Sequence, residues 1–573
     1  MIPRRKKGLE VRFLVILAGA AFAPAQAQGP ASQLRELERA WLELRTLSDQ
    51  LGVTRNLGAL VSPRGERADS LAVRVARTAS DLRDRAGRIP AQPLAVEDAK
   101  ALALLREQLA TLAAEAGARP APVADPADCA EPFPNRLRQA SLDELTTRAF
   151  ACYGAAARRI VVDGDTLDRL AILGLLGRTE DPARRQRLFL ALEPVWRSVN
   201  GDDGDGSPYR RMVSLRTANW KPGASPMEER ARGLGVEPDT LERWLVAVLE
   251  AWRATMPDTV LEPWEFHHLT GEASRLLSPR VPRDSLRAVV DGFYRELGAD
   301  PARLGVRYDL EPRPGKYPIS FTDFGGRDPI EPWIFTSYRT GGLDNLAELL
   351  HEVGHAVHIA AIRTRGAYAD WPDSDTFTEA VADLAALEAY EPEWQRRYLG
   401  TSASLASSIR AKYAGIVLDV AWALFEIRVH RSPQDSPNQI WTTITRTYLR
   451  IRPHPEWSWW ALRGQLVGNP GYMLNYAFGA ILIADIRDRV IAEHGPFSAG
   501  DPGWYGWIGP RLYRFGRERP AREVVREFLG RDVSAGPLLR DMGRGAGGQR
   551  GRTWQWGRGR LIRFPGSGSF RRP

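Results

Sequence analysis

One five-residue motif, His351-Glu352-Val353-Gly354-His355, constrains the local fold of this chain more than any other feature. Histidines four residues apart lie on one face of an α-helix, with Cβ atoms about 5–6 Å apart, so their imidazoles can converge on one metal ion. Apolar residues around the motif recur at helical spacing, and Asp344, which follows two glycines, is the expected N-cap. The motif therefore predicts a metal-binding helix. Two histidines hydrogen-bonded within a core are the alternative.

A third ligand is expected on residues 375–384, which have apolar residues along one face and Asp375 as the expected N-cap. Glu379 is the predicted ligand, because a catalytic zinc ion takes three protein ligands and leaves one position open. Asp383 follows one turn later and is expected to accept the second N–H of a ligand histidine. The sequence thus predicts one zinc ion per chain. A solvated carboxylate at Glu379 is the alternative.

These segments resemble the angiotensin-converting-enzyme family of gluzincin zinc peptidases (peptidyl-dipeptidase A). That family shows H-E-M-G-H and then, at the same separation, F-H-E-A-I-G-D, where this chain has Phe377-Thr378-Glu379-Ala380-Val381-Ala382-Asp383. Trp459-Trp460-Ala461-Leu462-Arg463 is similar to its W-W-x-L-R, and the segment beginning at Tyr476 is similar to its Y-F-V-S-F-I-I. The resemblance implies a large, mainly α-helical, two-lobed peptidase with a deep central cleft and a small β-sheet near the active site.

The chain also departs from that family. Where the family carries a lysine for the substrate's C-terminal carboxylate and a histidine for the scissile carbonyl, this chain has only the short stretch 464–472. Three segments are similar instead to the thimet oligopeptidase and oligoendopeptidase family: His355-Ala356-Val357-His358, Pro263-Trp264-Glu265, and Gly471-Tyr472 with Tyr476. The resemblance therefore implies hydrolysis of oligopeptides, with peptidyl-dipeptidase action as one expectation and oligoendopeptidase action as the alternative.

Each candidate site residue has an expected role in this chemistry. Glu352 is the expected general base, which takes the proton of a zinc-activated water. The oxyanion needs a further donor, and the resemblance implies Tyr476 first and Tyr472 second. A core aromatic residue is the alternative for each tyrosine. The resemblance also implies that Arg463 could hold an anion, either a substrate carboxylate or chloride, and an ordinary salt bridge is the alternative.

Two segments before the metal-binding helix are rich in aromatic and β-branched residues: 316–324 and 333–338. Turn residues separate them, which predicts two short strands. An exposed strand edge there could pair with the main chain of a peptide. A purely structural hairpin is the alternative.

The N-terminus predicts export to the periplasm or the extracellular space. Basic residues precede an apolar run at 13–23, and Ala25-Gln26-Ala27 matches a cleavage site, so residues 1–27 are the expected signal peptide. The run is too short to be a transmembrane helix, which needs about 20 residues. In an oxidising compartment Cys129 and Cys152, the only cysteines, are expected to form a disulfide, with two free thiols as the alternative.

The peptidase domain is expected to span residues 28–540, where helical patterns dominate. Long amphipathic helices are predicted at 31–52, 68–88, 95–116, 165–195, 237–256 and 404–428, and a proline-rich run covers 119–134. Residues 541–573 form a Gly/Arg-rich tail that is expected to be disordered and could contact anionic surfaces. Because the leader and this tail account for the net charge of +9, no nucleic-acid binding is expected of the folded domain.

Two other classes of function stay open on the sequence alone. One is a non-catalytic, envelope-associated protein that retains the fold and the metal, although the intact Glu352 argues against it. The other is a peripheral protein that binds the envelope through its basic tail.

Overall fold

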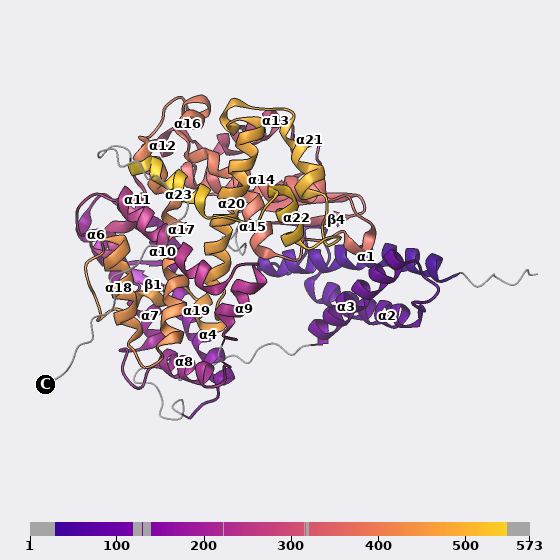
Figure 1. Ribbon diagram of the computed structural model, residues 1–573, viewed down its shortest axis with the longest axis horizontal. Coiled ribbons are helices and arrows are strands. Elements are labelled where there is room, and N and C mark those ends of the chain that lie inside the picture. Colours follow the sequence, from indigo (N-terminus) through magenta and orange to yellow (C-terminus); the bar gives the residue numbers. More distant parts are fainter. Residues whose placement is uncertain are drawn as a thin grey trace, which may run out of the picture.

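The computed structural model describes residues 29–117, 129, 139–221, 223–313, 316 and 320–546 (Figure 1). The predicted signal peptide, residues 547–573 and the proline-rich run, apart from Cys129, lie outside the described residues. Helices dominate the described part, together with one two-stranded and one three-stranded sheet. The predicted mainly α-helical class with a small sheet is therefore confirmed. Among the described residues, no helix has the length and apolar character needed to cross a membrane.

The first three helices pack around one apolar cluster, to which Ala367 and Tyr368 from later in the chain also contribute. They lie beside one another at the lower right of Figure 1, in indigo to violet. Their buried face includes Leu34, Leu37, Trp41, Leu71, Leu82 and Leu105. All three agree with the predicted ranges, α1 extending a few residues further, and their bounds are α1 (Pro30–Asn56), α2 (Ala68–Arg88) and α3 (Val96–Gly117).

A short hairpin and a series of helices precede the His351–His355 motif and contribute to the largest apolar cluster of the described residues. Their bounds are α4 (Leu142–Arg158), β1 (Ile160–Val162), β2 (Asp165–Leu167), α5 (Arg169–Arg178), α6 (Pro182–Leu190), α7 (Glu193–Asn200), α8 (Pro208–Ala218), α9 (Pro226–Gly233), α10 (Pro238–Thr255), α11 (Pro263–Thr270), α12 (Glu272–Leu277) and α13 (Leu286–Glu296). The helix predicted at 237–256 is confirmed as α10.

The single helix predicted at 165–195 is wrong, because the segment begins with β2 and its helix restarts twice. Asp181 caps α6, its carboxylate accepting a hydrogen bond of 3.0 Å from the backbone N–H of Ala183. Pro182 and Pro194 lie in the first turns of α6 and α7, where a missing N–H breaks no helical hydrogen bond. Apolar residues continue at helical spacing through both restarts, so the sequence pattern does not reveal them.

The rest of the chain forms the three-stranded sheet and the helices around it. Their bounds are β3 (Arg307–Asp309), β4 (Phe321–Arg327), β5 (Ile330–Phe335), α14 (Leu343–Ala361), α15 (Asp375–Ala386), α16 (Pro392–Leu399), α17 (Leu405–Arg431), α18 (Pro437–Leu449), α19 (Gln465–Gly468), α20 (Met473–His494), α21 (Trp504–Ile508), α22 (Ala521–Leu529) and α23 (Gly536–Gly543). The helix predicted at 404–428 is confirmed as α17.

The two predicted strands exist, but their bounds are shifted. β4 pairs antiparallel with β5, and β3 pairs parallel with the other side of β5, which leaves β4 at an edge of the sheet. Gly325 and Gly326, which are among the turn residues between the two predicted strands, lie inside β4, where the register shifts at Gly325. A Cβ on Gly325 would lie 2.6 Å from the indole of Trp333, so this close approach requires a glycine.

Both predicted helix caps are wrong by one or two residues. α14 starts after Gly342, whose φ of 110° favours glycine, and Asp344 lies in the first turn, where it accepts a hydrogen bond from the Ser274 hydroxyl. Ser374, not Asp375, caps α15, its hydroxyl accepting a backbone hydrogen bond of 3.2 Å. A cap is decided by the local dihedral angles, which residue type alone does not determine.

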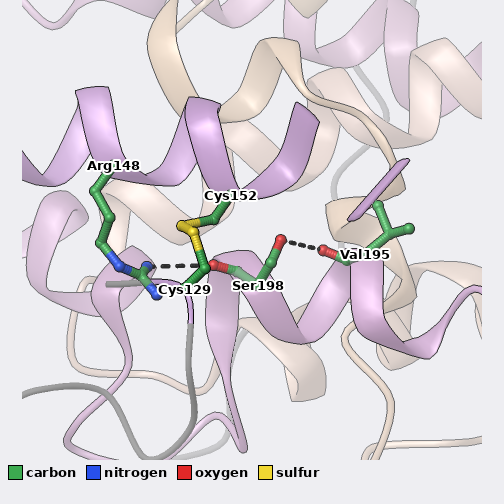
Figure 2. Close-up of a disulfide and its surroundings, with 5 residues drawn as sticks. All are labelled: Cys129, Arg148, Cys152, Val195 and Ser198. Atoms are coloured by element: carbon green, nitrogen blue, oxygen red, sulfur yellow. Dashed lines mark hydrogen bonds between the residues drawn. A yellow bond between two sulfur atoms is a disulfide. The ribbon is translucent and has the colours of Figure 1, made fainter. Parts of the chain in front are cut away.

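The predicted disulfide is confirmed. Cys129 is bonded to Cys152 of α4, with Cα atoms 5.3 Å apart (Figure 2). Beside it, Arg148 of α4 donates a hydrogen bond of 3.3 Å to the carbonyl of Ser198 in α7. The bond therefore attaches residue 129 to a part of the core where α4 and α7 are held together.

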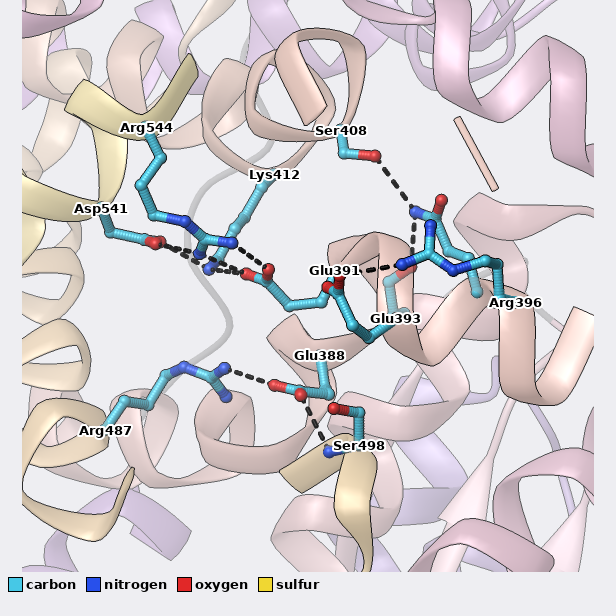
Figure 3. A network of polar contacts seen from close by, with 12 residues as sticks. Glu388, Glu391, Glu393, Arg396, Ser408, Lys412, Arg487, Ser498, Asp541 and Arg544 are labelled. Atoms are coloured by element: carbon cyan, nitrogen blue, oxygen red, sulfur yellow. Dashed lines mark hydrogen bonds and ion pairs between the residues drawn. The ribbon is translucent and has the colours of Figure 1, made fainter. Parts of the chain in front are cut away.

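The folded part of the chain extends beyond the predicted boundary at residue 540. Asp541 and Arg544 join an ion cluster with Lys412 and Glu391 (Figure 3). Lys412 Nζ lies 2.6 Å from Asp541 Oδ2 and 3.0 Å from Glu391 Oε1, and the Lys412 side chain is only 2% exposed. The prediction of a disordered tail is therefore wrong for residues 541–546.

A chain that ends at residue 540 is expected to be less stable than one that ends at 546. The shorter chain leaves Lys412 with one buried partner instead of two, and breaking a buried ion pair costs about 3–5 kcal/mol. Urea unfolding of both proteins measures the difference, with the full-length chain as control. Equal free energies of unfolding would restore the boundary at 540.

Candidate metal centre

The site is built on two helices that touch through their backbones. A Cβ on Gly354 of α14 would lie 2.1 Å from the carbonyl oxygen of Ala382 in α15. This close approach brings Glu379, which lies almost one turn before Ala382, next to the histidines of α14. Glycine in the motif is therefore a packing requirement as well as a spacer.

The three predicted ligands lie together. One donor atom from each of His351, His355 and Glu379 lies within 4.8 Å of the others. Glu379 Oε2 is 3.5 Å from His351 Nε2 and 3.8 Å from His355 Nε2. Ligand atoms about 2.0–2.1 Å from a tetrahedral ion are about 3.3–3.4 Å apart, whereas a hydrogen bond would bring N and O to about 2.9 Å. The donor set and its spacing fit a zinc ion better than a hydrogen-bonded cluster.

Asp383 lies where the sequence predicts. Its Oδ1 is 2.7 Å from His351 Nδ1, which leaves Nε2 to face Glu379. Burial lowers the pKa of His351, but the carboxylates of Asp383 and Glu379 outweigh it and hold that pKa well above its usual range. Burial raises the pKa of Glu379, but the neighbouring imidazoles of His351 and His355 outweigh it and hold that pKa far below its usual range. The cluster thus attracts a cation.

Glu352 is buried beside the cluster. Its Oε2 lies 2.6 Å from the hydroxyl of Thr322 in β4, and the residue as a whole is 5% exposed. The sequence placed Thr322 in a strand but gave no sign of this contact, because the two residues are 30 positions apart.

Tyr472 and Tyr476 lie at the start of α20. The buried carboxylate of Glu426 holds this end of the helix in place. Glu426 of α17 accepts hydrogen bonds of 2.9 Å from the backbone N–H of Gly471 and 3.3 Å from that of Met473. The rings of Tyr472 and Tyr476 lie 5.5 Å apart. Neither the sequence pattern nor the resemblance pointed to Glu426.

Burial is the main influence on the pKa of Tyr472. Burial, followed by Tyr476 and then by the carboxylates of Asp375 and Glu379, raises the pKa of Tyr472 to about 12. The phenol therefore keeps its proton at neutral pH and can donate a hydrogen bond.

Arg463 already has an anionic partner within the protein. Its Nη2 lies 2.8 Å from Asp419 Oδ1, and its guanidinium lies 4.8 Å from the centre of the Tyr476 ring. Burial raises the pKa of Asp419 to about 6, although Arg463 opposes the shift. The ordinary salt bridge is therefore the arrangement present, and chloride has no support.

The fold is similar to those of solved peptidases. A PZ peptidase A structure with an inhibitor has a TM-score of 0.56 and 15% identity, covering 90% of this chain and 96% of that chain. A putative oligoendopeptidase F has a TM-score of 0.54 and 16% identity, covering 90% and 95%. An M32 carboxypeptidase from Deinococcus radiodurans covers 90% and 100% at 16% identity, but its TM-score of 0.49 is too low to add to the argument.

At such identities the similarity shows the fold alone. No protein-family model and no curated protein matches the chain. The resemblance to the angiotensin-converting-enzyme family in particular rests on the motifs.

A cavity of about 1210 Å³ lies beside the site, between the ends of α9, α10, α15, α20 and α22. Its wall includes Asp375, Thr376 and Phe377 but none of the three ligands. The Glu379 side chain, next along α15, is 58% exposed, so the metal cluster opens to solvent close to this cavity. The cavity is therefore the candidate for the predicted deep cleft.

Gly354→Ala is expected to weaken zinc binding at least tenfold. The added methyl group collides with Ala382 and must push α14 and α15 apart, which also costs about 1–3 kcal/mol in stability. Titration against a competing chelator measures the affinity. Gly292→Ala in α13, where nothing lies within 4 Å of the added atom, is the matched control and should bind zinc normally. Unchanged zinc affinity in Gly354→Ala would contradict this account of the packing.

Glu426→Gln is expected to change how stability depends on pH. Burial raises the pKa of Glu426 from 4.5 to about 7, so folding binds a proton between these values and the stability contribution is lost as pH rises through that range. The variant lacks this titration and should gain stability relative to the wild type as pH rises from about 4.5 to about 7. Urea unfolding across the range tests it, with Glu393→Gln on the exposed surface as control. Parallel pH profiles would refute the assignment.

Proposed function

We propose that this chain is a zinc-dependent metallopeptidase that hydrolyses peptide bonds of oligopeptides. The convergence of donor atoms from His351, His355 and Glu379, with the Glu352 carboxylate on the same helix, carries the proposal. Similarity of fold to PZ peptidase A and to a putative oligoendopeptidase F supports peptides as the substrate class.

A zinc ion in this cluster would supply Lewis acidity and lower the pKa of a water molecule. Glu352 then takes the proton of the attacking water and returns it to the leaving amine. Tyr472 and Tyr476 are the candidate donors to the oxyanion, since a phenol keeps its proton at neutral pH and can donate it in a hydrogen bond. β4 lies at the sheet edge and offers main-chain groups to an extended peptide.

Two modes of cleavage fit this site. The motifs similar to the angiotensin-converting-enzyme family favour release of C-terminal dipeptides. The pairing of Arg463 with Asp419 and the similarity of fold to a putative oligoendopeptidase F favour internal cleavage. Endopeptidase action is the second candidate.

We also propose that the protein acts in the periplasm or outside the cell. The signal-peptide pattern at residues 1–27 supports export, and the Cys129–Cys152 disulfide agrees with an oxidising compartment. Contact of the basic C-terminal residues with anionic surfaces belongs to the same proposal.

Glu352→Gln is expected to bind one zinc ion per chain and to lose at least a hundredfold in kcat, because general-base catalysis contributes about 10²–10⁴. His351→Ala is expected to lose both the metal and the activity. Metal analysis and cleavage of a peptide library, read by mass spectrometry, measure these effects. A wild-type protein that binds zinc but cleaves no peptide would instead identify a non-catalytic relative.

The same library decides the mode of cleavage when its peptides carry blocked termini. If C-terminal amidation abolishes cleavage, the enzyme is a peptidyl-dipeptidase. If amidation has no effect and internal bonds are cut, it is an endopeptidase.

A further inference from the structure

Thr322 makes a short, buried contact with the candidate general base. Its Oγ1 lies 2.6 Å from Glu352 Oε2 and 3.0 Å from the backbone carbonyl oxygen of Glu352. A hydroxyl has one hydrogen to donate, and the carboxylate is both the nearer and the stronger acceptor. Both residues are at most 9% exposed, so water hardly competes for the bond.

This contact gives the two carboxylate oxygens of Glu352 different hydrogen bonding. Oε2 is held by Thr322, whereas Oε1 has no hydrogen bond to any described residue. A glutamate side chain otherwise samples several rotamers, and fixing one oxygen also fixes the direction of the other.

We propose that Thr322 is a positioning residue, which rests on the proposed peptidase function. Its hydroxyl holds Glu352 Oε2 and thereby presents Oε1 to the attacking water. In this proposal the hydroxyl acts only through Glu352, the residue to which both of its hydrogen-bond contacts belong.

The position of Thr322 in the sheet gives the contact a second consequence. Thr322 pairs with Ile334 of β5 and belongs to β4, the edge strand proposed to receive the peptide. One residue therefore joins the substrate-binding strand to the general base.

Thr322→Val removes the hydroxyl but keeps the shape of the side chain and its β-branch. Loss of a hydrogen bond that orients a catalytic group reduces activity about 10- to 100-fold. We expect a loss of this size in kcat, KM within about twofold of the wild type, and an unchanged zinc content of one per chain. Thr322→Ser keeps the hydroxyl and should retain kcat within about threefold.

Thr336→Val is the matched control. Thr336 is fully buried near the same sheet, and its hydroxyl has no hydrogen-bond partner among the described residues. The same chemical change there should leave kcat unchanged. A similar loss of kcat in Thr336→Val, or wild-type kcat in Thr322→Val, would overturn the proposal.

A second measurement is independent of turnover. Urea unfolding of the zinc-free wild type, Thr322→Val, Glu352→Ala and the double variant forms a double-mutant cycle. If the bond exists, the double variant loses less stability than the two single variants together. An additive cycle would overturn the Thr322 proposal alone, whereas a wild type without zinc-dependent cleavage would overturn the proposed peptidase function.

Discussion

The close approach of α14 and α15 is the constraint on which the site depends. A side chain at Gly354 would collide with the backbone of Ala382, so the two helices touch only because that position carries no Cβ. The contact places Glu379 within 3.5–3.8 Å of the imidazole nitrogens of α14. Zinc ligands must lie about 2.0–2.2 Å from the ion, and one methyl group between the helices would remove the third ligand from that range.

Buried polar contacts then orient the individual side chains. Asp383 fixes the ring of His351, Thr322 fixes one oxygen of Glu352, and Glu426 holds the start of the helix that carries both tyrosines. Apolar packing brings helices together, but it does not select which ring nitrogen or which carboxylate oxygen faces the site. Hydrogen bonds with one geometry make that selection, so the site combines a close-packed helix pair with a few directed contacts.

The sequence predicted the fold class, most long helices and the grouping of His351, His355 and Glu379, because helical spacing and short motifs are local properties. His351, His355 and Glu379 lie in two segments whose internal spacing already implies their faces. Thr322 and Glu426 were missed because their partners lie 30 and 45 residues away, and no periodicity relates such pairs. Two local patterns were also misleading. Apolar residues continued at helical spacing through the restart at Pro182, and Gly325, which lies in a strand, resembled a turn residue.

The electrostatics around the tyrosines bear on what the site can recognise. A dipeptidase must hold the C-terminal carboxylate of its substrate, which calls for a cation with unused charge. Arg463 lies against Tyr476, but its charge is already paired with Asp419 at 2.8 Å, so a substrate carboxylate would have to share the guanidinium with this carboxylate. Recognition of the peptide main chain along β4 needs no such cation, because backbone N–H and C=O groups supply the hydrogen bonds. Within the proposed peptidase function, the pairing of Arg463 with Asp419 is therefore an argument for the second candidate, an enzyme that binds an extended backbone without holding a chain end.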